Sequence, residues 1–540
     1  MVFIVEDEEE LPGLANELQQ KGLAAILQKE GSNLLYGKSM SFCIYDSVLV
    51  KIRTAEGINS DGSLAKIHPN TTYSEDENIS AIITKAEKLI KNGFSNQAIS
   101  KQMAPTGIGH VPDYTNDNSF PSLGYRMLAA AKIFSVIDNF YSHKKTMKKN
   151  WEKCYRDMIP VFIAAKDSFQ YMRTVAEFHA AIEDSHGFIG NANESFGFRL
   201  NPIIQRRGDF IPPVFTGMIE NKVLVTGIYD ENASRSIGIS KGDIVLSIDG
   251  KDPLKMIEDV RKYQNASTKA SQTFFICSFL LFGKENQVLH LKLMDVKGKI
   301  KNVTMPTLGK FTGDVSSDSY VLGLYEHHTK PAFSLISKDI GYADFTSPME
   351  QKDVDSMFNL FKNTKAIIFD MRGYPHSPIG FENFARNPDA ILAKFSTPAP
   401  SSPKIKSIDY AIMQNEDNHI EYVSINFNNS GPTYQGKVVM LINEIAQSQA
   451  EHICLTLKGL CNATFVGSPT AGADGLTTDF NIPGGIKLWF SGQSVMLPDG
   501  KPLQCVGLQP DIYVRPTIKG FQAGKDEVLD RAIKLIQTGK

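Results

Sequence analysis

A serine, Ser448, lies where an apolar strand-like run gives way to a helical pattern. Residues 437–444 read Lys-Val-Val-Met-Leu-Ile-Asn-Glu, with the length and composition of a buried parallel strand. Residues 448–459 have helical spacing, with Gly459 as a candidate C-cap. A serine in such a turn is well placed as a nucleophile, because its hydroxyl is lifted off the sheet. The first N–H groups of the helix are then free to bind an oxyanion.

The same residues also have a purely structural interpretation. Ser448 and Glu451 form the Ser-x-x-Glu pattern of a capping box, in which the serine caps the helix and the glutamate reaches back to it. Taken alone, this is the commoner role of the pattern. The two roles are compatible, because one hydroxyl can lie at a helix start and still face a substrate.

Several segments around Ser448 resemble the catalytic domain of the C-terminal processing (tail-specific) peptidases, a family that includes the tricorn-type proteases. They are Leu-Ile-Asn-Glu at 441–444, Ser-Gln-Ala-Glu at 448–451, Val-Gly-Ser-Pro-Thr-Ala-Gly at 466–472 and Val-Gly-Leu-Gln-Pro-Asp at 506–511. The resemblance covers roughly residues 123–540. It implies that Ser448 is the nucleophile of a serine peptidase.

An adjacent serine and histidine, Ser185 and His186, follow a predicted helix at 168–182. By itself, a histidine there would only be favourably placed near the negative end of the helix dipole. In the tricorn-type branch an adjacent Ser-His pair belongs to the active site. The resemblance therefore implies that His186 is the general base and that Ser185 orients it.

Two positions distinguish the branches of the family. The tail-specific branch uses a lysine base in a loop after the nucleophile helix, and Ala473 stands in that place here, which excludes a lysine at this position. The tricorn-type branch has a glutamate just before its closing Gly-Val-x-Pro-Asp motif, where this chain has Gln504. A glutamine can still orient Ser185 by hydrogen bonding, although it carries no charge.

The oxyanion donors are predicted from the helix start and from one loop. Gln449 contributes the first helical N–H. In the family, a second donor comes from a Gly-rich loop after an Asp-x-Arg segment, which is residues 370–372 here. The following Pro375 has no N–H, so the donor is Gly373, Tyr374 or His376, and we favour the N–H of Tyr374. His376 is also a rival general base.

A run in the middle of the chain resembles the hallmark of PDZ domains. Residues 242–250 read Gly-Asp-Ile-Val-Leu-Ser-Ile-Asp-Gly, ending in an Asp-Gly tight-turn signal. PDZ domains bind peptides by strand addition and capture a C-terminal carboxylate with backbone N–H groups. The expected binding loop, near 214–217, matches the usual pattern poorly, so a structural or gating role stays open beside peptide binding.

Together these features predict an α/β chain with a ClpP/crotonase-like catalytic core, a helical subdomain and an inserted PDZ domain rich in β structure. The expected divisions are an N-terminal α+β region of unknown role (1–119), the helical subdomain ending in Ser185-His186 (120–199), the PDZ-like domain (200–305) and the peptidase core (306–540). Spacing of apolar residues predicts helices at 14–28, 79–91, 123–140 and 151–164, and a strand at 42–52.

Composition excludes several other classes of function. The formal net charge of −2 argues against polyanion binding as the main activity, so no nucleic-acid partner is expected. No apolar run approaches the roughly 18 to 20 residues of a membrane span. The six cysteines include no Cys-x-x-Cys pair, so we expect no metal and no cofactor. The start of the chain is not a signal peptide; the expectation is a bacterial cell envelope or periplasm if a leader was removed, and otherwise the cytoplasm.

The predicted function is a serine endopeptidase of the C-terminal processing, tricorn type that cleaves unfolded or C-terminal peptide segments. Ser448 attacks, His186 takes its proton, and Ser185 and Gln504 hold the imidazole. The alternative is a catalytically silent peptide-binding protein that keeps the fold, which Gln504 and the unusual loop at 373–375 favour. An esterase-like hydrolase would keep the nucleophile and change the substrate. The sequence does not indicate an oligomeric state.

Overall fold

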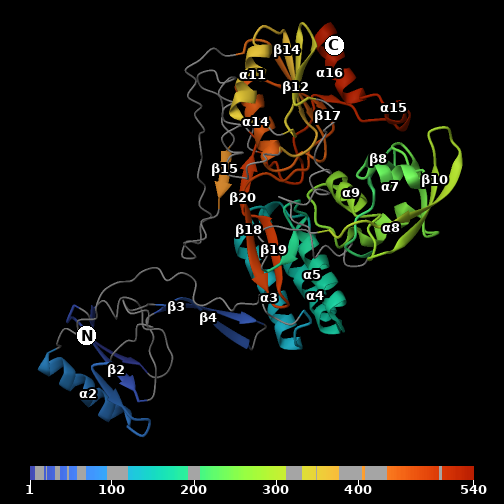
Figure 1. Cartoon of the computed structure of the whole chain (residues 1–540). Coiled ribbons are helices and arrows are strands. Elements are labelled where there is room, and N and C mark those ends of the chain that lie inside the picture. The colour runs from blue at the N-terminus through green and yellow to red at the C-terminus, as the bar shows by residue number, and fades with distance from the viewer. Residues whose placement is uncertain are drawn as a thin grey trace. The chain divides into compact units, whose positions relative to one another are not determined.

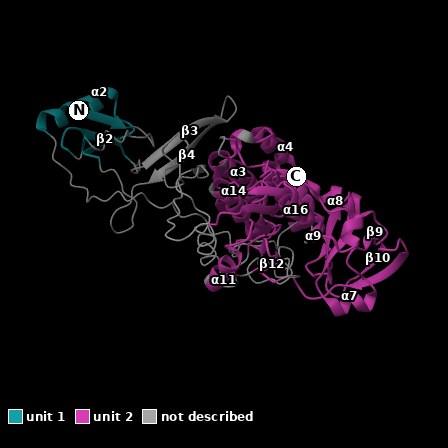
Figure 2. Cartoon of the chain, turned by 90° about the horizontal axis from the view of Figure 1, so that it is seen from above, with its two compact units in different colours: residues 1–113 teal, residues 114–540 magenta. Residues whose placement is uncertain are grey.

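The computed structural model describes residues 1–5, 18–19, 21–30, 37–44, 48–56, 69–93, 119–192, 207–311, 331–347, 349–375, 404–407, 434–497 and 501–539. The chain divides into two compact units, Met1–Asp113 and Tyr114–Lys540 (Figure 2). All predicted site residues belong to the second unit. None of the helices in the described ranges is both long and apolar enough to span a membrane.

The first unit contains a small parallel sheet and one helix. The strands β1 (Val2–Val5), β2 (Ala25–Lys29) and β5 (Thr71–Tyr73) pair in the order β1-β2-β5. Helix α2 (Ile79–Asn92) packs against this sheet and confirms the helix predicted at 79–91. A separate antiparallel hairpin is formed by β3 (Gly37–Ile44) and β4 (Val48–Glu56).

Two predictions in this unit are wrong. The helix expected at 14–28 is a strand from Ala25 onward, because β2 is the middle strand of its sheet and is buried on both faces. Such a strand has a continuous apolar run, which periodicity alone does not separate from a buried helix. The single strand expected at 42–52 is instead the end of β3 and the start of β4.

The second unit is built around a six-stranded sheet in the order β12-β13-β14-β16-β17-β21 (Figure 1). Its strand β12 is antiparallel to β13, and the others pair in parallel. The strands are β12 (Phe333–Ser337), β13 (Ile340–Asp344), β14 (Ala366–Met371), β16 (Lys437–Ile442), β17 (Thr464–Gly467) and β21 (Ile512–Tyr513). The strand at 437–442 lies where the sequence predicted a buried parallel strand.

Helices cover both faces of this sheet. On one face, α11 (Gln351–Phe361) and α14 (Gln449–Cys461) pack on side chains such as Phe369 and Met440. On the other face, α16 (Glu527–Thr538) packs on Ile368 and Val439. Neighbouring residues of one strand therefore face opposite layers, which explains why β14 and β16 are almost wholly apolar.

The helical subdomain carries the segment with His186. Its helices are α3 (Leu123–Phe140), α4 (Trp151–Ala164) and α5 (Ser168–His179), continued by a 3-10 turn (Ala180–Ile182). They share a hydrophobic core with a sheet of β18 (Thr477–Ile482), β19 (Ile486–Ser491) and β6 (Ile189–Asn191). The helices at 123–140 and 151–164 are confirmed at both ends.

The pairing of β6 with β19 sets up the candidate site. The two strands are antiparallel, with Ile189 opposite Leu488. Continued by three residues, this register places His186 opposite Ser491. A second short pair, β15 (Lys404–Ser407) with β20 (Gln493–Met496), follows directly along the chain.

Residues 207–311 form a separate antiparallel sheet with its own helices, which we call the insert (Figure 1). Its strand order is β11-β10-β9-β8-β7, and its hydrophobic core also takes in Phe188 and Trp489 of the helical subdomain's segment. The strands are β7 (Val214–Ile219), β8 (Lys222–Ile228), β9 (Ile244–Ile248), β10 (Val288–Met294) and β11 (Ile300–Pro306). The helices are α7 (Glu231–Ile237), α8 (Pro253–Arg261) and α9 (Lys269–Ser278).

Helix α9 of the insert packs against its edge strand. Strand β7 is the last of the five strands, and Thr216 of β7 donates its hydroxyl hydrogen to the carbonyl of Cys277 in α9 (2.7 Å). The side chains of Val214 in β7 and Cys277 in α9 are both buried.

Candidate active site

The nucleophile turn holds Ser448 in an unusual backbone conformation. Its φ is 55° and its ψ is −120°, a region that residues with a side chain rarely adopt. Such a conformation costs on the order of 1–3 kcal/mol and persists only where neighbours hold it. Here the Ser448 N–H donates to the Ala473 carbonyl (2.8 Å), and the Ser448 carbonyl accepts from the His452 N–H (2.9 Å). The strain therefore occurs at the residue predicted to react.

Glu451 joins this turn to the loop at 470–473. The Glu451 carboxylate accepts from the N–H groups of Gly472 (2.8 Å) and Ala473 (2.9 Å) and from the hydroxyl of Thr470. The capping box is present, and one of its two hydrogen bonds runs from the Ser448 N–H to the Glu451 side chain (3.2 Å). Burial, together with the nearby Asp474, raises the pKa of Glu451 to about 8. The capping-box interpretation thus describes how the turn is built, and it leaves the reactive role of the serine open.

The helix that follows is longer than its sequence predicted. It continues past Gly459 to Cys461, and Asn462 in the left-handed conformation forms its C-cap. The predicted C-cap at Gly459 is therefore wrong. Asparagine tolerates this backbone conformation better than most residues, so either residue was a possible helix end.

His186 is buried and held from one side by a short chain of polar groups. Its Nδ1 lies 2.9 Å from Ser491 Oγ. The Ser491 hydroxyl in turn donates to Asp184 Oδ1 (2.9 Å), and the Ser491 N–H donates to Asp184 Oδ2 (2.6 Å). The His186 N–H also donates to Asp184 (3.0 Å). One carboxylate therefore fixes both the backbone of His186 and the serine that contacts its ring.

This chain of hydrogen bonds determines the tautomer of His186. A serine hydroxyl has one hydrogen, and that of Ser491 is given to Asp184, which as a carboxylate can only accept. Ser491 must therefore accept from His186, so Nδ1 carries the proton and Nε2 presents a lone pair. Within the described part of the chain, Nε2 of His186 is buried and has no hydrogen-bond partner. The ring is thus prepared to accept a proton at Nε2.

Burial lowers the pKa of His186, while the negative charges of Asp184 and Asp474 act in the opposite direction. The ring is therefore neutral at neutral pH, as a general base must be. Asp474 also raises the pKa of Tyr374, which contacts Ser448. The same carboxylate thus acts on both sides of the candidate site.

Ser185 and Gln504 are buried near His186, but among the described residues neither makes a hydrogen bond to its ring. The Ser185 hydroxyl accepts from the Ser267 N–H (2.8 Å). Gln504 Nε2 donates to Asp184 Oδ1 (3.0 Å) and to Ser267 Oγ (3.2 Å). The partner of His186 Nδ1 among the described residues is Ser491. Gln504 therefore acts on the imidazole through Asp184, whereas the sequence pointed to Ser185.

Asp184 and Ser491 were missed by the sequence analysis. Asp184 directly precedes the Ser-His pair, so its position was a usable signal. Ser491 ends a strand that is 305 residues away from His186 in the chain, and no local pattern marks it. Only the pairing of β6 with β19 brings the two together.

The nucleophile and base segments meet next to Ser448. The side-chain amide of Gln447 donates to the carbonyl of Ser185 (3.2 Å), which ties the residue before the nucleophile to the residue before the base. No hydrogen bond joins Ser448 directly to His186 within the described residues, because Nε2 of His186 has no partner there. Catalytic hydrogen bonds are often long in enzymes without substrate and tighten on binding.

Tyr374 reaches Ser448 with its side chain. The phenol hydroxyl shares a hydrogen bond with the Ser448 side chain and accepts from the Gln449 N–H. The ring is partly exposed, but the hydroxyl end is enclosed, and burial raises its pKa to about 12. The hydroxyl is therefore neutral and occupies the position where an oxyanion bound to Gln449 N–H would lie. The predicted role of the Tyr374 N–H stays a prediction, and His376 lies outside the described residues.

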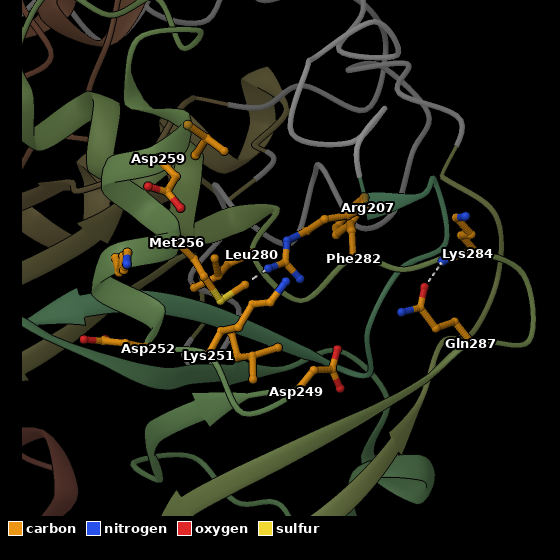
Figure 3. A pocket seen from close by; sticks show the side chains of 13 residues that line it. Arg207, Asp249, Lys251, Asp252, Met256, Asp259, Leu280, Phe282, Lys284 and Gln287 are labelled. Atoms are coloured by element: carbon orange, nitrogen blue, oxygen red, sulfur yellow. Dashed lines mark hydrogen bonds between the residues drawn. The ribbon is translucent and has the colours of Figure 1, made fainter. Parts of the chain in front are cut away.

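Other places in the described residues contribute no chemistry to this site. No group of His, Cys, Asp and Glu in the described ranges could hold a metal ion. A pocket of about 560 Å³ lies wholly in the insert, between α8 and residues 280–287 (Figure 3). Its lining mixes basic and acidic side chains over an apolar floor, and it includes none of the predicted site residues.

Residues 396–514 match the sequence model of peptidase family S41. The matched part contains Ser448, Ser491 and Gln504, whereas His186 precedes it. A search of curated proteins finds no match. The family match thus includes the segment in which the sequence predicts the nucleophile.

The structure is similar to solved structures of CPAF. Mature CPAF gives a TM-score of 0.58 at 14% identity over 77% of this chain and 97% of that chain. CPAF complexed with lactacystin gives a TM-score of 0.57 at 14% identity over 77% of this chain and 99% of that chain. The photosystem II D1 C-terminal processing protease gives 0.40 at 14% identity, over 75% and 98% of the two chains. At this identity the CPAF likeness shows the fold alone.

Residues 396–514 therefore carry the sequence of a serine peptidase of family S41, a hydrolase that acts on peptide bonds. The described residues form a mixed α/β fold similar to that of the CPAF structures. A peptidase takes a peptide as its substrate.

Proposed function

We propose that the protein is a serine endopeptidase of the C-terminal processing, tricorn type, with Ser448 as nucleophile and His186 as general base. The observation that carries this proposal is the tautomer of His186. The Ser491–Asp184 pair places the proton on Nδ1 and leaves a buried lone pair on Nε2, beside the segment that holds Ser448. Ala473, in place of a lysine, supports the histidine-based branch over the lysine-based one.

The reaction follows from these positions. Ser448 Oγ attacks the carbonyl carbon of the scissile peptide bond, and its proton passes to Nε2 of His186. The imidazolium that forms keeps its Nδ1–H on Ser491, and Asp184 stabilises the positive charge. The same proton is then given to the departing amine, which leaves an ester on Ser448. Water repeats the sequence, with its proton taken by Nε2 and then returned to Ser448.

The oxyanion of the tetrahedral intermediate would be bound by the Gln449 N–H at the start of α14. In the structure without substrate, the Gln449 N–H donates a hydrogen bond to the Tyr374 hydroxyl. A substrate carbonyl must therefore displace the phenol before the reaction can begin. This displacement makes the free enzyme less reactive than the substrate complex.

Substrates are proposed to be unfolded or C-terminal peptide segments, as the resemblance to the C-terminal processing peptidases implies. The run at 242–250 supports a PDZ-like assignment for the insert, and its five-stranded antiparallel sheet is compatible with it. Helix α9 packs against the edge strand β7, and both peptide binding and a structural role stay open for this domain. The cell envelope or periplasm is the proposed location, with the cytoplasm as the alternative.

A catalytically silent peptide-binding protein is the second candidate. The Tyr374 hydroxyl on Ser448 and the uncharged Gln504 favour it, because both would be tolerated in a protein that no longer reacts. The deciding experiment is labelling of the full chain with a fluorophosphonate, read as intact mass, together with cleavage of an unfolded protein. One adduct that is lost in Ser448→Ala and retained in Ser236→Ala, a change of an exposed serine in α7, supports the enzyme. A folded protein that takes no label and cleaves nothing is the silent form.

A further inference from the structure

The insert contacts the base segment through helix α9, where Phe275 packs on Phe188, and through the loop at residues 264–268, which connects α8 to α9. Its residues Gln264, Asn265, Ala266 and Ser267 are buried, with exposed fractions from 4% to 9%. Buried polar side chains need hydrogen-bond partners. For Asn265 and Ser267 the partners lie on the segment that leads to His186, in a different subdomain.

Asn265 holds the backbone on both sides of the turn before His186. The Asp184 N–H donates to Asn265 Oδ1 (2.7 Å), and Asn265 Nδ2 donates to the carbonyl of His179 (3.0 Å). A Cβ placed on Gly187 would lie 1.9 Å from Asn265 Nδ2. The asparagine therefore packs directly against the backbone that follows His186, and a glycine is needed there for this approach.

Ser267 makes a reciprocal pair with Ser185. The Ser185 N–H donates to Ser267 Oγ, and the Ser267 N–H donates to Ser185 Oγ, both at 2.8 Å. Ser267 Oγ also accepts from Gln504, the side chain that donates to Asp184. The serine of the insert thus contacts both groups that flank the Asp184 carboxylate.

The segment held in this way would not keep its shape by itself. Glu183, one residue before Asp184, has a left-handed backbone with φ of 53°. For a residue with a side chain this conformation costs on the order of 1 kcal/mol and has to be imposed by its surroundings. The bonds to Asn265 and Ser267 supply that constraint.

We infer that Asn265 and Ser267 of the insert are positioning residues for the general base, an inference that rests on the proposed function. By fixing the backbone of residues 184 and 185, they aim the Asp184 carboxylate at Ser491, which orients the ring of His186. The insert is then a working part of the catalytic apparatus, in addition to any role in contacting substrates.

The test uses Asn265→Ala and Ser267→Ala in the full chain, with peptide hydrolysis measured across pH. We expect kcat to fall by about 10- to 100-fold, the loss typical of a misplaced catalytic group, with KM little changed. The rising limb of the pH profile should also move to lower pH. Asp184 raises the pKa of His186, and a displaced carboxylate raises it less. Ser267→Thr keeps the hydroxyl and should restore most of the lost rate.

Ser247→Ala is the matched control, because it makes the same change within the insert on β9, where Ser247 pairs with Lys292. Folding is followed by circular dichroism and thermal unfolding. If Asn265→Ala does not fold, the Ser267→Ala and Ser267→Thr pair decides. The inference is wrong if a folded variant keeps the kcat of the parent. It is also wrong if kcat falls but the rising limb of the pH profile stays at the parent's pH. Neither result contradicts the proposed function. A parent chain that neither hydrolyses peptides nor takes a fluorophosphonate overturns both.

Discussion

The nucleophile side and the base side of this site differ in how far along the chain their contacts reach. Glu451 bonds to residues 21 and 22 positions away, at Gly472 and Ala473. On the base side, His186 and Asp184 bond to Ser491 and Gln504 at separations of 305 to 320 residues. The turn at Ser448 is thus held mainly by one local supersecondary unit, to which Tyr374 and the bond from Gln447 to Ser185 add longer contacts. The base side is assembled from four segments, of which one belongs to the insert. Local patterning can specify the first, and only the completed fold specifies the second.

The largest expected effect is on the nucleophile side. Ser448→Ala should abolish peptide hydrolysis and fluorophosphonate labelling, because no other described group takes its place. Folding should be preserved, since the turn is held through backbone bonds of Ser448 rather than its side chain. Ser448→Gly should also be inactive and raise the free energy of unfolding by roughly 1 kcal/mol, because glycine adopts this backbone conformation without strain. Residual hydrolysis at the parent rate in either folded variant would remove Ser448 from the mechanism.

The next largest effect tests whether the base side works as one unit. Asp184→Asn should lower kcat by roughly a hundredfold or more, because the correct tautomer and the charge that stabilises the imidazolium are both lost. In the parent, the rising limb should lie below the ordinary histidine pKa of about 6.5, since burial lowers the pKa of His186. It should move lower still in Asp184→Asn, because Asp184 raises that pKa.

Ser491→Ala is the companion variant. It breaks the connection between Asp184 and the ring without removing the charge, so it should reduce kcat and leave the limb closer to its parent position. Identical pH profiles for Asp184→Asn and the parent would show that another group acts as the base.

A smaller effect is expected at Gln504. Gln504→Glu places a second carboxylate about where an amide now donates to Asp184 at 3.0 Å. Two carboxylates at this distance repel each other, which disfavours ionisation of one of them. We therefore expect kcat to fall about tenfold at neutral pH. It should recover as the pH falls, because the protonated carboxyl can donate a hydrogen bond to Asp184. Gln504→Met removes the donor without adding charge and should show no such recovery. An unchanged rate in Gln504→Glu would mean that residue 504 does not act on Asp184.

The smallest effect has the opposite sign. Tyr374→Phe removes the hydroxyl that occupies the Gln449 N–H. A neutral hydrogen bond contributes about 0.5–1.5 kcal/mol net, so its loss should raise the fluorophosphonate labelling rate of Ser448 about two- to tenfold. Labelling that slows instead would show that the phenol assists the reaction as a donor.

The sequence predicts those parts of the site that local contacts hold, and it misses those that long-range contacts hold. The strand at 437–442 and the helix start at 449 were predictable, because a buried strand and a capping box are encoded by neighbouring residues. Tyr374 reaches Ser448 with its side chain, which a sequence does not show, and the predicted role of its backbone N–H remains a prediction. The role of Asp184 needed the position of Ser491, which no nearby residue encodes.

The fold shows the same limit. Periodicity predicted α3 and α4 to the residue, because each has a long pattern and a clear start. It failed at β2, where a strand buried on both faces has no alternation to detect. The predicted domain divisions and the PDZ-like assignment of the insert remain predictions, although the insert's own sheet and core are evident.

The distance along the chain between His186 and Ser491 also has a consequence for the order of events in folding. Contacts that close loops of 305 residues and more form late in folding, because the entropy of closure must be met before they add stability. Refolding followed by far-ultraviolet circular dichroism and by fluorophosphonate labelling should therefore show helices well before labelling. A nascent or half-folded chain would carry its nucleophile turn without an oriented proton acceptor. The capacity to cut other chains would then arise only once the enzyme's own chain is complete.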